Sequence, residues 1–501
     1  MRALDLPLPL NLTLNRTRTI EAAPGTWHAP IWALERFGDQ PALTEADGRT
    51  HSYRALAALA DEAAAPLQAG SVFALACSNT LASVSTYLGA LRKHAVPLML
   101  DAALLPEQTE ALLQRYGIRQ CFDGASGQWR EVPGTVPAPT LHADLGLLLS
   151  TSGSTASPKL VRLSRDNLAA NAASIAHYLQ LDAGEVAITT LPLHYSYGLS
   201  VLNSHLGCGA RVVLTEASVA QAGFWQQMRD HGVTSLAGVP TLWRLLRRLR
   251  FERMSLPALR TLTQAGGRLE PEEIQWLADG ARAAGRRVFI MYGQTEATAR
   301  IAYLPPSLLP TKVGSIGVAI PGGRLRVLDA EGQAITAPGV DGQLAYSGPN
   351  VMMGYAETPE QLADGAQLNE LLTGDLGHVD DEGCFWVTGR LKRFVKVFGH
   401  RVSLDEVERD VRAIVGAIGL EAGVTGRDDC VMIGLAGGAD AARCAELQRT
   451  LAQRYRWLPA ALRVLPVAAL PLASNGKPQY GELLALLDAQ AESPKAAAGA
   501  R

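Results

Sequence analysis

The sequence predicts an α/β fold with a large N-terminal domain of parallel-type sheets and helices, a β-rich subdomain, and a small C-terminal α+β domain. Three observations predict this class. Short apolar segments alternate with helix-like segments over the first 300 residues or so, as in parallel sheets covered by helices. After about residue 310, glycines punctuate short alternating segments, which is typical of a β-rich unit. Beyond about residue 390, roughly 95 residues carry further helix and strand patterns, enough for a small domain.

The first strand-like run, at residues 72–76, is followed by Asn79, a good N-terminal cap for a helix that extends to about Arg92. Residues 96–100 are again apolar, and Pro106 suits the first turn of another helix. The alternation continues through four more apolar runs, at residues 145–149, 186–190, 212–214 and 288–291. We therefore expect the strands of the large domain to be mainly parallel.

The two later units are marked by shifts in composition. Short alternating segments lie at residues 325–328 and 343–346, with a turn signal at Asp341-Gly342 between them. A second shift occurs at residues 389–392, and the Ala-rich end of the chain is expected to fray. The predicted boundaries are a large domain at 1–391, a small domain at 392–487 and a flexible tail at 488–501.

Length, charge and cysteine usage exclude several classes of protein. A chain of 501 residues is too long for one hydrophobic core, and 48% hydrophobic with 19% charged residues is typical of a soluble globular protein. A net charge of −2 means that the chain has no excess of positive charge that would favour binding to nucleic acid or to an anionic membrane. The six cysteines form no CxxC pair, and neither a signal-peptide core nor a membrane-spanning run is evident. We therefore expect a cytoplasmic protein.

A hydroxyl-rich loop follows the apolar run at residues 145–149. Backbone N–H groups of such a loop can surround phosphate oxygens, while hydroxyls donate and a lysine supplies charge. It is not a Walker A loop, because Pro158-Lys159 leads into the strand-like residues 160–163 rather than a helix, and this disfavours a P-loop kinase or ATPase. Taken alone, a loop of this kind is more often a surface turn. The candidate phosphate-binding residues are Thr151, Ser152, Gly153, Ser154, Thr155 and Lys159.

Two later segments offer the other parts of a nucleotide site. Residues 292–296, Tyr-Gly-Gln-Thr-Glu, follow the apolar run at 288–291, and Asp375 lies in a later Thr-Gly-Asp segment. A carboxylate such as Asp375 can accept both ribose hydroxyls, and Glu296 at a strand end can hold Mg²⁺ beside phosphates. Tyr292 offers a flat face for a base. Each feature alone fits a cap, a turn or a core tyrosine, so their order along one chain is what indicates a nucleotide site.

Together these motifs resemble the adenylate-forming superfamily, which contains acyl-CoA synthetases, peptide-synthetase adenylation domains and luciferases. The resemblance covers nearly the whole chain, from about residue 30 to 485, and residues 151–159 are similar to the family's phosphate loop, TSGTTGxPK. Ala156 replaces the usual glycine; this adds only a methyl group, although a positive φ would be harder to adopt there.

The resemblance implies a role for each matching position. Tyr292 would stack on adenine, Thr295 would contact the α-phosphate, and Glu296 would bind Mg²⁺. The ribose would be held by Asp375 and Arg390. The segment that lies against adenine, together with the glycine after the stacking tyrosine, would comprise Ala265, Gly266, Gly267 and Gly293.

The resemblance also implies that the small domain is mobile. Lys392 would be the hinge between the domains, and Lys396 with Gly399 would face the site during thioester formation. Lys477, in a Ser-Asn-Gly-Lys loop, would bridge the substrate carboxylate and the α-phosphate and stabilise the charge that develops there. The residues after it, Pro-Gln-Tyr, depart from the commoner Val-Asp-Arg. A lone lysine near a terminus would otherwise be a solvated surface charge.

The pocket for the acid is less specific. In the segment 191–199, His194 resembles the aromatic gate of acyl- and aryl-CoA ligases, and Tyr195 follows it, although a histidine satisfied by backbone groups in the core is the alternative. The segment has no aspartate to hold a substrate ammonium, which disfavours an α-amino acid. Small residues at Ala237, Gly238 and Val239 would leave room for a ring or chain. An aryl or short-to-medium acyl acid is favoured.

We thus expect an ATP- and Mg²⁺-dependent ligase that forms an acyl- or aryl-adenylate from a small carboxylic acid. It would pass the acyl group to coenzyme A or to the phosphopantetheine of a separate acyl carrier protein, because only 24 residues follow Lys477. Two alternatives are an amino-acid adenylation protein that loads a separate carrier and a catalytically silent nucleotide-binding homologue. The presence of Lys477, Glu296 and Asp375 disfavours the silent homologue.

Overall fold

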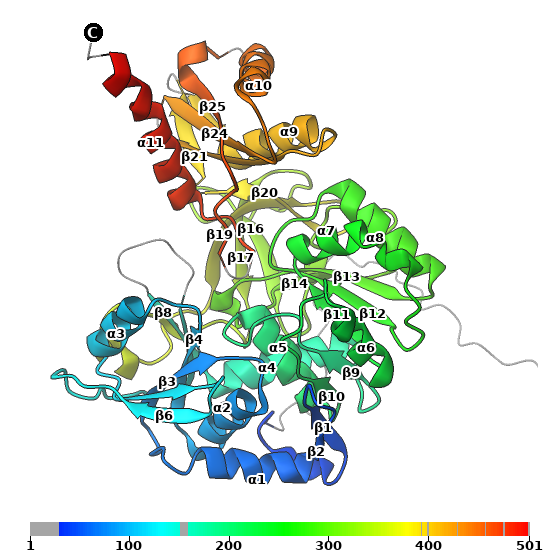
Figure 1. Ribbon diagram of the computed structural model, residues 1–501, viewed down its shortest axis with the longest axis vertical. Helices are drawn as coiled ribbons and strands as arrows, with labels where there is room; N and C mark the ends of the chain where they lie inside the picture. Colours follow the sequence, from blue (N-terminus) through cyan, green and yellow to red (C-terminus); the bar gives the residue numbers. More distant parts are fainter. Residues whose placement is uncertain are drawn as a thin grey trace, which may run out of the picture.

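The computed structural model of the protein confirms the α/β class, with two large sheets, a smaller antiparallel sheet and a small C-terminal unit (Figure 1). The structure describes residues 30–150, 159–391, 393–397, 400–427, 429–455, 457–473 and 476–498. No described helix is long and apolar enough to cross a membrane. All six cysteines are free thiols.

The first large sheet has nine strands and carries the predicted nucleotide and acid segments at its strand ends. From β13 across to β1 neighbouring strands are parallel, whereas the edge strands β14, β15 and β2 are antiparallel. The order is β15 (Val318–Ala319), β14 (Ala302–Leu304), β13 (Arg287–Tyr292), β12 (Thr261–Gln264), β11 (Ser235–Gly238), β9 (Val186–Ile188), β10 (Arg211–Val213), β1 (Pro41–Thr44) and β2 (Thr50–Ser52).

The second large sheet has seven strands, with a parallel centre of β7, β4, β3 and β5. Its order is β18 (Gly354–Ala356), β8 (Leu160–Ser164), β7 (Leu145–Ser150), β4 (Val96–Asp101), β3 (Val72–Cys77), β5 (Gln120–Asp123) and β6 (Gln128–Glu131). The helices of this part of the chain are α1 (Tyr53–Ala63), α2 (Leu81–Lys93) and α3 (Pro106–Arg115).

The N-cap of α2 differs from the sequence-based expectation. The cap is Thr80, whose hydroxyl accepts from the backbone N–H of Ser83, not Asn79. The Asn79 amide instead donates to the carbonyls of Leu191 and Thr215, each at 3.3 Å. Threonine and asparagine are both good caps, and here the amide is used to join the second sheet to the loops of the first.

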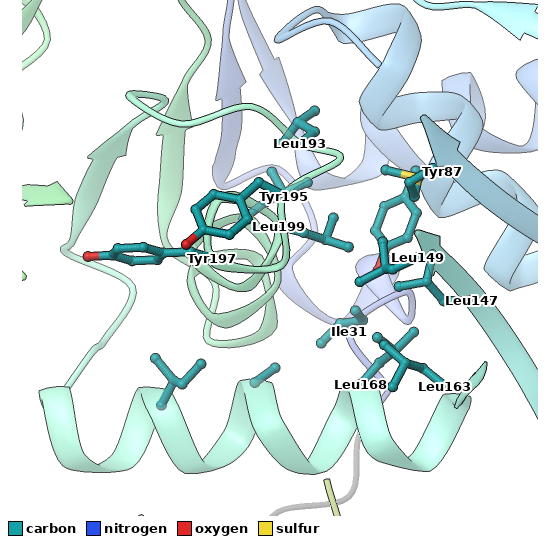
Figure 2. Close-up of a cluster of buried hydrophobic side chains, with 14 of the residues drawn as sticks. Ile31, Tyr87, Leu147, Leu149, Leu163, Leu168, Leu193, Tyr195, Tyr197 and Leu199 are labelled. Atoms are coloured by element: carbon teal, nitrogen blue, oxygen red, sulfur yellow. The ribbon is translucent and has the colours of Figure 1, made fainter. Parts of the chain in front are cut away.

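Two helices, α4 (Arg165–Leu179) and α5 (Ser196–Gly207), lie against the two large sheets and share one core with them. Leu147 and Leu149 of β7 pack into the same cluster as Leu168 of α4 and Leu199 of α5 (Figure 2). A reciprocal capping box of Ser164 and Asn167 begins α4, with hydrogen bonds of 3.0 and 2.8 Å. The shared core fixes the start of α5, where the acid-pocket segment ends.

The β-rich subdomain predicted after residue 310 is a four-stranded antiparallel sheet of β16 (Arg324–Leu328), β17 (Gly342–Ser347), β19 (Leu371–Val379) and β20 (Phe385–Arg390). Its register places Asp375 directly opposite Arg390. Beyond it, Leu391 donates its backbone N–H to the carbonyl of Gly374 at 2.8 Å. The predicted ribose residues therefore meet across one strand pair.

The small C-terminal unit lies over the end of this sheet (Figure 1) and has its own apolar core. Arg409 of α9 donates to the carbonyl of Thr388 on β20 at 3.1 Å. Arg393 forms ion pairs with Asp405 at 2.7 Å and with Glu408 at 3.0 Å. The elements are β21 (Phe394–Val397), β22 (His400–Ser403), α9 (Leu404–Gly416), β23 (Glu421–Arg427), β24 (Cys430–Ala436), α10 (Ala441–Tyr455), β25 (Leu462–Pro466) and α11 (Tyr480–Ala498).

Candidate active site

Three of the predicted nucleotide residues form one hydrogen-bonded group. Asp375, 4% exposed, accepts from Arg390 Nε at 2.8 Å and from Tyr292 Oη at 2.5 Å. The Asp375 carboxylate raises the pKa of Arg390, while burial and the same carboxylate raise the pKa of Tyr292 well above its usual value. The Asp375 carboxylate thus lies between a cation and a hydroxyl donor, where it could also accept hydrogen bonds from sugar hydroxyls.

The predicted adenine segment packs tightly against neighbouring residues. Gly266 has a φ of +84°, and a Cβ there would lie 2.4 Å from Tyr195 Oη. Ala265 is buried, and its backbone N–H donates to the carbonyl of Gly238. A Cβ on Gly293 would lie 1.9 Å from the carbonyl oxygen of Ala299. Gly267 is more open, with Pro240 nearest to it. The predicted adenine segment therefore lies directly against Tyr195 of the predicted acid pocket.

Thr295 and Glu296 lie in a short turn after β13 that is held from both sides. Thr295 Oγ1 is 3.3 Å from Ser196 Oγ at the start of α5. Glu296 Oε1 accepts from Tyr355 Oη at 2.7 Å. Asn350 Nδ2 donates to the carbonyls of Ala297 and Arg300, each at 2.8 Å. These bonds fix the turn where the α-phosphate and metal contacts are predicted.

Lys159 lies next to the same turn because β8 pairs with β18. Its ammonium forms an ion pair with Glu357 and lies 5.6 Å from the ring of Tyr355. Tyr355 therefore contacts both the predicted phosphate lysine and the predicted metal carboxylate. Sequence reasoning missed Tyr355 and Glu357, since only the strand pairing brings them to the site. Thr151, Ser152, Gly153, Ser154 and Thr155 lie outside the described residues.

Lys477, from the small domain, reaches this site. Its Nζ lies 5.5 Å from the ring of Tyr195. Burial lowers the pKa of Lys477 and Arg390 adds to that effect, whereas the carboxylates of Glu296 and Asp375 oppose it. The adjoining loop is close to the large domain, because a Cβ on Gly476 would lie 2.8 Å from Thr241 Oγ1.

The other residues predicted to act from the small domain are only partly described. Lys396 lies on β21, paired in register with Arg401 of β22. Lys392 and Gly399 lie outside the described residues. The roles predicted for these three residues therefore stay predictions.

The acid-pocket residues gather where β11 and the start of α5 meet. Tyr195, Ala237 and Val239 are all buried, and a Cβ on Gly238 would lie 2.7 Å from the ring of Trp243. Tyr195 and Val239 contact Gly266, so the predicted acid pocket adjoins the predicted adenine segment.

His194 stands beside this pocket, with Nε2 3.6 Å from Asp101 Oδ2. Burial lowers the pKa of His194, which favours the neutral ring at neutral pH. Its Nδ1 is buried and has no hydrogen-bond partner among the described residues. The alternative to a gate is a core histidine whose ring nitrogens are satisfied by backbone groups. His194 Nδ1 has no such backbone partner among the described residues.

The donor set is compatible with magnesium held between protein and phosphates. Among the described residues no group of three or more His, Cys, Asp or Glu side chains could hold a metal ion. Mg²⁺ bound to nucleotide phosphates needs only one or two protein carboxylates. Glu296, which accepts a hydrogen bond from Tyr355 next to Lys159, would supply one.

Known proteins resemble this chain in sequence and in structure. The AMP-binding enzyme family matches residues 31–135 and 123–356. A sulfoacetate–CoA ligase of Cupriavidus necator is 33% identical over 70% of this chain and 68% of the ligase, and an oxalate–CoA ligase of Arabidopsis thaliana is 28% identical over 75% and 80%. The o-succinylbenzoate CoA synthetase of Bacillus subtilis, solved with ATP and magnesium, has a similar fold. It gives a TM-score of 0.74 at 23% identity, covering 91% of this chain and 99% of that one.

Proposed function

The chain belongs to the family of AMP-binding enzymes as an AMP-forming acid–thiol ligase, and we propose that it converts a carboxylic acid to an acyl- or aryl-adenylate and then to a thioester. The acceptor is the thiol of coenzyme A or of a carrier protein's phosphopantetheine. One observation carries the proposal: Lys477 of the small domain lies among Tyr195, Asp375, Arg390 and Glu296 of the large domain. This brings a cation to the point where acid and nucleotide would meet.

In the first half-reaction, a carboxylate oxygen of the acid attacks the α-phosphorus of ATP, and the bond to the β-phosphate oxygen breaks. Pyrophosphate leaves, so no proton is transferred. Lys477 would lie between the two anions and offset the charge that develops on the α-phosphate. Asp375 would hold the ribose, while the Thr295 hydroxyl and the Lys159 ammonium would hold phosphate oxygens, so that the protein acts chiefly by positioning.

Glu296 would bind magnesium together with phosphate oxygens of the nucleotide. Bound there, Mg²⁺ would neutralise part of the negative charge on the phosphates. The part played by this chain is to fix the carboxylate, and the hydrogen bond from Tyr355 does so.

In the second half-reaction, the sulfur of the thiol attacks the carbonyl carbon of the adenylate. The bond between that carbon and the AMP oxygen breaks, AMP leaves, and the thiol proton is lost to solvent. We propose that the small domain turns about Lys392 between the halves, which withdraws Lys477 and brings Lys396 and Gly399 to the site. His194, in its neutral form, would line the path by which the thiol reaches the adenylate and would act as a gate.

The acid is proposed to be an aryl or short-to-medium acyl acid rather than an α-amino acid. No aspartate lies between Leu191 and Leu199 to hold an ammonium group. Loading of an amino acid onto a carrier would gain support if proline or another imino acid stimulated pyrophosphate exchange. A silent homologue would gain support from ATP binding without acyl-AMP across a broad acid panel.

ATP–pyrophosphate exchange with pools of aryl, fatty and amino acids tests the proposal. Removal of a single charge-stabilising group typically lowers such a rate by about 10²–10³-fold, so Lys477→Ala should lose exchange with the active pool. Lys93→Ala is the matched control, because Lys93 lies on α2 and donates to the carbonyls of Ala64 and Ala65 away from the site. Absence of exchange with every pool, or exchange unchanged in Lys477→Ala, would sink the proposal.

A further inference from the structure

The end of α7 (Pro240–Arg248) and the turn after it carry a dense group of arginines. The ten residues 244–253 contain five arginines and one glutamate, in a chain whose net charge is −2. Arg244 forms an ion pair with Glu273 at 2.6 Å. The other four arginines are exposed, and we call them the basic patch: Arg247, Arg248, Arg250 and Arg253.

Helix stability explains only part of the basic patch. Cations in the last turn of a helix interact favourably with its dipole, which accounts for Arg247 and Arg248. Arg250 and Arg253 lie beyond the end of α7, where this effect has ended. Leu249, between the two pairs, is 37% exposed. Four cations around an exposed leucine form a surface that an anionic partner would stabilise.

Helix α7 connects the basic patch to the candidate active site. Its first residue follows Val239 of the predicted acid pocket. A Cβ on Gly476 would lie 2.8 Å from Thr241 Oγ1, so the first turn of α7 also adjoins the loop of Lys477. From Thr241 to Arg248 the helix rises only about 10 Å. The basic patch therefore lies one short helix away from the point where acid, nucleotide and lysine are proposed to meet.

The basic patch also borders the small domain. Arg248 Nη2 lies 3.8 Å from Glu421 Oε1 on β23, and both side chains are more than half exposed. An exposed pair of this kind is weak, so it would not resist the proposed turn of the small domain. That turn would withdraw Lys477 from the first turn of α7 and separate the two domains there. A thiol that arrives from the side of the basic patch could then reach the adenylate.

The form of this surface favours a protein over a nucleotide as the partner. The exposed end of a helix is convex, whereas a small ligand such as the nucleotide of coenzyme A is usually enclosed in a concave site. An exposed leucine among arginines suits a protein interface, in which charged groups around an apolar contact steer the partner. A phosphopantetheine arm is longer than α7, so a protein bound at the basic patch could deliver its thiol to the site.

We propose that the basic patch docks the acidic face of an acyl carrier protein, so that the acyl group passes to carrier-bound phosphopantetheine. The inference rests on the proposed adenylation activity. The covalent step is the one described above: the sulfur of the arm attacks the carbonyl carbon of the adenylate, AMP leaves, and the thiol proton is lost to solvent. The arginines contribute binding of the carrier through charge complementarity.

Acyl transfer from preformed adenylate tests this proposal with three acceptors. They are an acyl carrier protein of fatty acid synthesis in its phosphopantetheinylated form, coenzyme A, and free pantetheine. We expect the wild type to show a higher kcat/KM for the carrier than for the other two, and rising salt to reduce that preference. Arg250→Glu/Arg253→Glu should lower kcat/KM for the carrier by at least ~10-fold, the lower end of what electrostatic steering contributes to association. Transfer to pantetheine, which has no protein to dock, should stay at the wild-type rate.

Arg49→Glu/Arg54→Glu is the matched control, because it makes the same change of charge at two exposed arginines beside β2 and in α1, remote from α7 (Figure 1). Its kcat/KM for the carrier should equal that of the wild type. ATP–pyrophosphate exchange needs no acceptor, so its persistence in both double variants would show that they are folded.

The possible contrary results are distinct from one another. An equal kcat/KM for the carrier in the wild type and in Arg250→Glu/Arg253→Glu would overturn the docking role of the basic patch. A wild type that acylates coenzyme A in preference to the carrier would overturn the carrier as acceptor and leave the adenylation proposal intact. Absence of pyrophosphate exchange with every acid pool would overturn both proposals.

Discussion

Replacing Tyr355 by phenylalanine removes one hydroxyl and keeps the ring, so the change separates the contact with Glu296 from the contact with Lys159. In the wild-type protein Tyr355 Oη donates to Glu296 Oε1 at 2.7 Å, and the Lys159 ammonium is 5.6 Å from the ring. Glu296 is the proposed magnesium ligand. Because the variant leaves its carboxylate without this donor, we expect a higher magnesium concentration for half-maximal adenylation.

The magnitude follows from the kind of hydrogen bond. A bond to a charged group contributes about 1.5–3 kcal/mol. Tyr355 is only part-buried, so water can replace some of the interaction and the lower end applies. About 1.5 kcal/mol corresponds to roughly a tenfold shift in the magnesium concentration at half-maximal rate.

The assay is the initial rate of ATP–pyrophosphate exchange against free Mg²⁺ at a saturating concentration of the active acid. Tyr303→Phe is the control, because Tyr303 is also part-buried and its ring stacks on Tyr178 at 4.3 Å, outside the site. Its profile should match the wild type. If the Tyr355→Phe profile superimposes on that of the wild type, the hydroxyl does not position Glu296. A uniform loss of rate with an unchanged midpoint would also refute the reasoning, since it would separate Tyr355 from the metal.

Two further predictions concern the hinge and the pH dependence of stability. Lys392→Pro fixes one backbone torsion at the proposed pivot, so thioester formation from preformed adenylate should slow, as single-turnover rates would show; wild-type rates in both half-reactions would exclude the pivot. Burial lowers the pKa of His205, so below about pH 6.5 the unfolded chain binds a proton that the folded protein does not, and stability falls as pH decreases. Urea unfolding at several pH values should show His205→Gln losing stability less steeply, by up to ~1.4 kcal/mol per pH unit, and parallel curves for the two proteins would contradict this.

Much of the fold and part of the site could be predicted because the sequence patterns that indicate them lie within short, continuous segments of the chain. Apolar runs and their turn residues indicated the parallel strands, and the segments holding Tyr292, Asp375 and Arg390 indicated nucleotide chemistry. The register of β19 and β20 then places Asp375 opposite Arg390, as two segments separated by a short turn would suggest. The roles of these residues in catalysis stay predictions.

Other features depend on contacts between distant parts of the chain. Tyr355 reaches Glu296 because β18 pairs with β8, and no local pattern signals that pairing. The cap of α2 was assigned to Asn79 because its amide suits a cap, but contacts with Leu191 and Thr215 determined its position. The burial of Arg300 was equally hidden, since an arginine after a turn is ordinarily solvated.

The residues on the two sides of position 392 make contacts with different domains. Leu391 is bonded to Gly374 in the large domain, whereas Arg393 is paired with Asp405 and Glu408 in the small one. The proposed pivot at position 392 therefore lies between a residue bonded to the large domain and a residue paired within the small domain. If the small domain turns at this position as proposed, it would carry Lys477 away from the site, while Asp375 and Arg390 would stay on β19 and β20. Such a turn would leave the proposed ribose contacts in place, so the adenylate could stay bound while Lys477 is exchanged for Lys396 and Gly399.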